Sequence, residues 1–190
     1  MRFAFFAIGL AAGVVAQATT LTFTGVADDF FEAYLSTNDT VQGTLICQQT
    51  GTWQSGGATG SISLVANVTN YLHVQARDAF GAPSMFIGQA SLSDAGFEFL
   101  NNTQTMLTNP NDWQLSLNGF GVNYITPTDL GPNGTGPWGT QSNIDINARR
   151  LWSNQTAGEH YFSIAIRPVP EPFTLIGIAG LALVAARKRK

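Results

Sequence analysis

The side chains that could carry nucleophilic or acid–base chemistry are few in this chain of 190 residues. There are two histidines, His73 and His160, and one cysteine, Cys47. A hydrolytic triad needs a nucleophile, a base and an acid that orients the base, and no local catalytic signature is present. His73 shares a strand face with Tyr71, Gln75 and Arg77, which is typical of a solvated face. His160 precedes an apolar strand, at whose edge we expect it. We therefore predict no catalytic residues and no enzymatic activity.

Carboxylates offer two further kinds of site. Asp28, Asp29 and Glu32 lie close together, but glycoside hydrolysis requires two carboxyl groups about 5–10 Å apart, which sequence proximity does not establish. We interpret these three residues as acids on a solvated turn. The oxygens of Asp28, Asp29 and Asp39 would suit Ca²⁺, so calcium is the alternative to our expectation of no cofactor. We expect no zinc or nucleotide site, because the chain has no Cys/His cluster and no phosphate-binding motif.

Two tryptophans lie in polar, glycine-rich segments, Trp53 in residues 51–60 and Trp138 in residues 131–142. A flat ring that faces outward can hold the apolar face of a sugar, while amides and carboxylates bind its hydroxyl groups. Trp53 and Trp138 are therefore the candidate glycan contacts. Trp113 and Trp152 fall within strand-like patterns and are expected in the core.

Apolar residues alternate with polar ones through most of residues 19–168, which is typical of half-buried strands. Turn-forming clusters separate about eight to eleven such segments, so we predict an all-β, antiparallel β-sandwich. No window outside the two ends shows a sustained helical repeat. The apolar members of the pattern are Leu21 and Phe23; Phe31, Ala33 and Leu35; Ile62, Leu64 and Ala66; Leu72, Val74 and Ala76; Phe97 and Phe99; Trp113, Leu115 and Leu117; Ile144, Ile146 and Ala148; and Phe162, Ile164 and Ile166.

The charge of this middle region argues against a nucleic-acid partner. The whole chain has a net charge of -3. Residues 19–168 hold four arginines, no lysine and eleven acidic residues, which leaves a net charge of −7. A surface of this sign repels a phosphate backbone. Cys47 has no partner for an internal disulfide and lies in a strand-like run, so we expect it to be buried.

The N-terminus has the three parts of a secretory signal in their usual order. Arg2 supplies the positive charge, residues 3–15 form an apolar run, and Ala16-Gln17-Ala18 has the small-x-small pattern of a signal-peptidase site. We predict a signal peptide over residues 1–18, with cleavage between Ala18 and Thr19.

A second apolar run, residues 173–186, precedes the basic tail 187–190. The positive residues indicate a transmembrane helix whose tail lies in the cytoplasm. Fourteen helical residues span about 21 Å, which is short for a hydrocarbon core about 30 Å thick. We therefore expect a transient anchor in the inner membrane, with residues 19–168 outside it.

The tripeptide Pro170-Glu171-Pro172, the apolar helix and the terminal basic tail together resemble the PEP-CTERM sorting signal of exported bacterial proteins. The resemblance covers residues 169–190 and implies recognition by an exosortase, a membrane transpeptidase that cuts near the tripeptide. It implies a tethered precursor that later reaches the cell surface or the extracellular matrix. We expect a non-catalytic envelope or matrix protein; the alternative is a carbohydrate-binding module for exopolysaccharide.

The middle region is similar to the galactose-binding-like jelly-roll domains of bacterial secreted proteins. The similarity lies in residues 27–35, which run from an acidic turn into an aromatic strand, in Trp53, in residues 70–78, Gly81 and 85–88, and more loosely in 148–153 and 161–162. Residues 36–39 replace the Asn-Gly turn of the family's first hairpin. The resemblance implies a jelly-roll-like sandwich.

Overall fold

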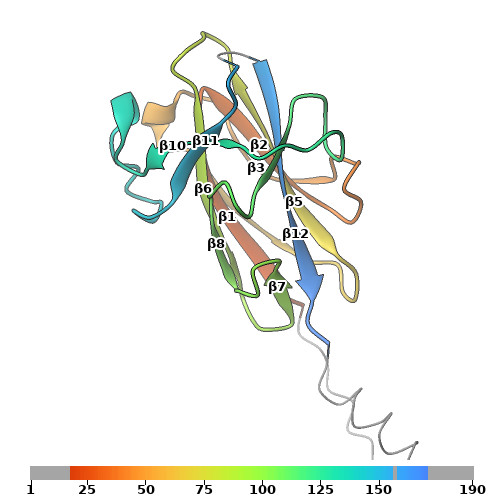
Figure 1. Ribbon diagram of the computed structural model, residues 1–190. Coiled ribbons are helices and arrows are strands. Elements are labelled where there is room, and N and C mark those ends of the chain that lie inside the picture. The colour runs from red at the N-terminus through yellow and green to blue at the C-terminus, as the bar shows by residue number, and fades with distance from the viewer. Residues whose placement is uncertain (1–17, 156–157, 171–190) are drawn as a thin grey trace, which may run out of the picture.

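The computed structural model describes residues 18–155 and 158–170 (Figure 1). These residues form twelve β-strands and two short 3₁₀ helices, so the predicted all-β class is confirmed. Every strand pairing is antiparallel. The predicted signal-peptide core, the transmembrane helix and the basic tail lie outside the described residues. Within the described ranges, no helix has the length and apolar character needed to cross a membrane.

The strands form two six-stranded sheets. Sheet A has the order β10-β11-β6-β1-β4, with β8 also paired to β6. Its strands are β1 (Thr20–Asp28), β4 (Ala58–Ser63), β6 (Met85–Leu92), β8 (Thr105–Leu107), β10 (Thr128–Pro132) and β11 (Arg149–Trp152).

Sheet B has the order β3-β2-β5-β12-β7, with β9 also paired to β12. Its strands are β2 (Phe30–Ser36), β3 (Thr44–Gln49), β5 (Asn70–Asp78), β7 (Phe97–Phe99), β9 (Gln114–Ser116) and β12 (Gly158–Pro168). The two 3₁₀ helices are η1 (Trp53–Ser55), after β3, and η2 (Gly136–Trp138), after β10.

The apolar alternation places one face of each sheet in a shared core. Phe86 of sheet A lies at its centre, with its ring centroid 4.7 Å from that of Phe162 and 5.6 Å from that of Trp113. Trp113 and Trp152 are buried, as predicted. Cys47 is half-buried against the core, and this burial raises the pKa of its thiol to about 11.

One predicted strand is wrong. Residues 143–148 form a loop, in which Ile146 is exposed while Ile144 and Ala148 are buried. The side-chain amide of Asn133 donates to the carbonyl oxygens of Gln141 and Ile144, both at 2.9 Å. These bonds fold the loop onto sheet A, so its two buried apolar residues pack against the outside of that sheet.

Both ends of the described chain leave the sandwich at the same turn, residues 93–96. Thr19 is buried, and its hydroxyl donates to Asp94 Oδ1 at 2.6 Å. The backbone N–H of Val169 donates to the carbonyl oxygen of Gly96 at 3.0 Å. We call this the exit end (Figure 1). Strands β2 and β12 begin at the opposite end, which we call the far end.

Candidate functional site

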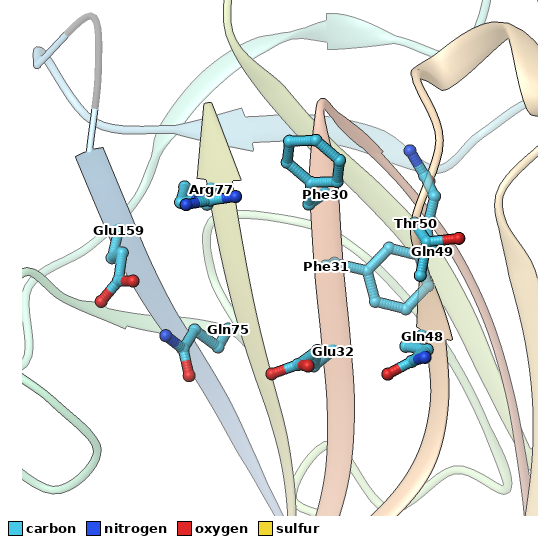
Figure 2. Close-up of a pocket in the computed structure, with 9 residues that line it drawn as sticks. All are labelled: Phe30, Phe31, Glu32, Gln48, Gln49, Thr50, Gln75, Arg77 and Glu159. Atoms are coloured by element: carbon cyan, nitrogen blue, oxygen red, sulfur yellow. The ribbon is translucent and has the colours of Figure 1, made fainter. Parts of the chain in front are cut away.

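A groove lies on the outer face of sheet B, near the far end. Antiparallel pairing sets Phe30 of β2 opposite Arg77 of β5, and Arg77 opposite Glu159 of β12. In the next row, Glu32 lies opposite Gln75. Figure 2 shows these side chains on the three neighbouring strands. The groove has a volume of about 340 Å³, and we call it the sheet-B groove; it is also lined by Phe31, Gln48, Gln49 and Thr50.

The charged side chains in this groove are not neutralised by ion pairs. The Arg77 guanidinium lies over the Phe30 ring, 5.0 Å from its centroid. Glu32 accepts a hydrogen bond from the Tyr34 hydroxyl, and Glu159 accepts one from the Tyr161 hydroxyl at 2.6 Å. Among the described residues, all ion pairs lie elsewhere. Arg77 and both glutamates are therefore available to a ligand.

The tyrosine hydroxyls beside the glutamates stay protonated. The hydrogen bond to Glu159, together with burial, raises the pKa of Tyr161 to about 12. Burial and the hydrogen bond to Glu32 raise the pKa of Tyr34. Both tyrosines therefore act as fixed hydrogen-bond donors that orient the groove carboxylates.

Two loops, residues 37–42 and 117–126, cover the outer face of sheet B around His73 and Ser163. Asp39 Oδ1 accepts hydrogen bonds from Tyr124 (2.8 Å), Ser163 (3.1 Å) and His73 Nε2 (3.3 Å). The Phe120 ring stacks on His73, with centroids 4.1 Å apart. The prediction of a solvated His73 is therefore wrong: the loops bury it fully, and this burial lowers its pKa.

His160 was expected at a strand edge, and this prediction is also wrong. Its side chain is fully buried, its Nε2 is hydrogen-bonded to Ser153 Oγ at 2.7 Å, and it stacks on Trp152 at 3.9 Å. A hydrolytic triad contains a serine and a histidine at this distance, together with a carboxylate that orients the histidine. In the part of the chain that the structure describes, the other ring nitrogen has no hydrogen-bond partner, and burial lowers the pKa of His160 to about 4. This pair links Ser153, which directly follows β11, to His160 of β12, and both side chains are buried.

The three aspartates considered for calcium do not come together. Asp28 and Asp29 lie at the far end, before β2, whereas Asp39 follows β2 toward the exit end. Asp29 Oδ2 accepts the backbone N–H of Ala79 at 3.1 Å. Within the described part of the chain, no group of three or more His, Cys, Asp or Glu side chains could hold a metal ion.

The structure brings Trp53 and Trp138 together at a second groove, which we call the Trp53 groove. It has a volume of about 570 Å³ and is also lined by Gln54, Gly56, Thr140, Gln141, Ser142 and Asn143. Trp53 is half-buried. Trp138 is only 6% exposed, and its Nε1 donates to Asp28 Oδ2 at 2.7 Å. Trp138 therefore forms the floor of the groove, and Trp53 presents the more accessible ring.

The Asp28 carboxyl gives stability a dependence on pH. Burial is the main cause that raises its pKa to about 6, and Asp29 and Asp78 add to the shift. Stability from this group is complete below its unfolded pKa and is lost as pH rises through 6. The buried His73 and His160, whose pKa values are lowered, contribute stability in the opposite direction between pH 5 and pH 7, so the Asp28 effect is measured as a difference between two proteins. Compared with the wild type, Asp28→Asn should raise the stability at pH 7 relative to that at pH 5 by less than about 1 kcal/mol, since the group is partly solvated.

Urea unfolding at the two pH values, followed by tryptophan fluorescence, measures this effect. The matched control is Asp94→Asn, because hydrogen bonds from Thr19, Gly96 and Ser93 lower the pKa of Asp94. That substitution should reduce stability at pH 7. An unchanged pH dependence in Asp28→Asn would contradict the assignment.

Most residues of the sheet-B groove were not candidates from sequence. Glu32 was considered only as an acid on a turn, and Phe30, Gln75 and Arg77 only as members of strands. The sequence feature that could have indicated them is the set of polar residues that alternate with the core residues in each predicted strand and therefore face outward. No family model, curated protein or solved structure matches this chain.

Proposed function

We propose that this chain is an exported β-sandwich that binds polysaccharide in the sheet-B groove and has no catalytic activity of its own. The observation that carries the proposal is the groove on the outer face of sheet B, where a half-exposed phenylalanine ring lies beside an arginine and two glutamates that form no ion pair among the described residues. A sugar ring has an apolar face and a rim of hydroxyl groups. Phe30 suits the face, while Arg77, Gln75 and the glutamates suit the hydroxyls.

Export and sorting form the second part of the proposal. The signal peptide 1–18 directs secretion, and Pro170-Glu171-Pro172 with the segment that follows is recognised by an exosortase. This proposal is supported by the common exit of both chain ends beside residues 93–96. In β12, Glu159 precedes Pro168 by nine residues, or about 30 Å of extended strand. A chain anchored at the exit end therefore presents the groove away from the membrane.

The third part of the proposal is the type of β-sandwich. Two antiparallel sheets around one core agree with a jelly-roll-like sandwich similar to galactose-binding-like domains. One sandwich fold can bind many unrelated ligands through its exposed faces and loops. The ligand must therefore be inferred from the residues of the site and not from the fold.

Phe30→Ala should abolish most of the glycan binding. The full chain, placed in lipid nanodiscs, is screened on a glycan array and then titrated with the exopolysaccharide of the producing cells. We expect about a 5- to 30-fold loss of affinity, because an aromatic contact in a binding site is worth on the order of 1–2 kcal/mol.

Phe80→Ala is the matched control, because Phe80 is 83% exposed and lies outside the groove. It should bind as the wild type does. The proposal fails if the wild type binds no glycan, or if both variants bind equally well.

A further inference from the structure

The Trp53 groove lies on the opposite face of the sandwich from the sheet-B groove. Val26 of β1 and Ile87 of β6 alternate with core residues, so both face away from sheet B. Trp138 and Ile144 pack on these two residues, and Trp53 packs against the same cluster. Residues 50–57 connect β3, at the edge of sheet B, to β4, at the edge of sheet A. The chain therefore passes round the side of the sandwich between the two grooves.

The two grooves have similar chemistry. Each combines one half-buried aromatic ring with side-chain amides. In the Trp53 groove, Asn143 Nδ2 donates to the carbonyl oxygen of Gly56 at 2.8 Å, which fixes the side chain and leaves its oxygen as an acceptor. Gln54 is exposed, and Thr140 and Ser142 add hydroxyl groups. None of the described residues that line this groove is charged, so it suits the neutral part of a glycan.

A single extended glycan cannot occupy both grooves. Packed sheets lie about 10 Å apart, and each groove opens on the side of its sheet that faces away from the other. Two ligand chains on these faces are therefore separated by both sheets and by the side chains that cover them. Simultaneous occupation requires two separate chains or a sharp bend around β3 and β4.

We propose that the protein is bivalent and cross-links two polysaccharide chains, one in the sheet-B groove and one in the Trp53 groove. This inference rests on the proposed function, because it assigns the same ligand class to the second groove. Two linked sites hold a polymer network together even when each site binds weakly. The protein then acts as a cross-link in the matrix, which is a mechanical role that needs no catalysis.

The test uses the full chain at one copy per nanodisc, with two probes from the producing cells: the purified exopolysaccharide and a hexasaccharide fraction prepared from it. Calorimetry with the hexasaccharide should give two sites per wild-type chain, and one site in either Trp53→Ala or Phe30→Ala. Light scattering with the polymer should rise to a maximum at an intermediate protein-to-polymer ratio. Both single variants should bind the polymer without this rise.

Gln54→Ala is the second variant for the Trp53 groove, because this residue lines the groove and its side chain is exposed. Gln54→Ala should lower the hexasaccharide affinity of the Trp53 groove several-fold and leave that of the sheet-B groove unchanged. One site in the wild type, with normal binding by Trp53→Ala, would overturn bivalency and leave the proposed function standing. Absence of any hexasaccharide or polymer binding would overturn both.

Discussion

Arg150→Ala is expected to lower the free energy of unfolding by about 3–5 kcal/mol. Arg150 is fully buried, and its guanidinium donates to the carbonyl oxygens of Pro132 and Gly139. It also lies 5.6 Å from the centroid of the Trp138 ring. Alanine would leave the two carbonyl oxygens without donors and open a cavity beneath the loop of residues 131–148. Urea unfolding measures the loss.

The matched control for this substitution is the neighbouring arginine. Arg149 forms a partly exposed ion pair with Asp129 at 2.8 Å. Such pairs contribute about 0–1 kcal/mol to stability. Arg149→Ala should therefore change stability by less than about 1 kcal/mol. Equal effects of the two substitutions would show that Arg150 does not organise the loop. Arg150→Ala should also reduce glycan binding in the Trp53 groove, whose floor is Trp138, more than glycan binding in the sheet-B groove.

Replacing Pro170, Glu171 and Pro172 with alanine should stop processing of the precursor. Proline restricts its own backbone and that of the residue before it to extended conformations, and alanine removes this restriction. We expect a processing enzyme to bind the tripeptide in such an extended form. We expect unprocessed protein to accumulate in the inner membrane. Membrane fractionation and mass spectrometry detect this accumulation.

The wild-type product provides the reference for that experiment. Its mature chain should begin at Thr19 and end near Glu171. Unchanged release of the processed form by the triple variant would contradict sorting through this motif. A mature wild-type chain that still ends at Lys190 would show that the helix is a permanent anchor.

The sequence predicts the sandwich well where strands alternate regularly. Phe31, Leu72 and Phe162 all occupy the core face that their alternation indicated. The same alternation wrongly predicts a strand at Ile144, Ile146 and Ala148, which lie in a loop. That loop takes its shape from Asn133, and alternation carries no information about a contact of this kind.

The two grooves differ in how much of each the sequence could reveal. Trp53 and Trp138 were candidates because their loops are polar and glycine-rich, but the burial of Trp138 depends on Asp28, which is distant in the sequence. The sheet-B groove depends on the register that aligns Phe30, Arg77 and Glu159 from three strands. Register follows from tertiary pairing, so no local pattern could have assembled these residues.

Hydroxyl-radical footprinting of the full chain, with and without the exopolysaccharide, tests glycan binding at the sheet-B groove most directly. This method measures solvent access to each aromatic side chain. We predict that the polysaccharide reduces oxidation of Phe30 and leaves oxidation of the exposed Phe80 unchanged. Equal oxidation of Phe30 in the bound and free protein would contradict the assignment of this groove as the binding site.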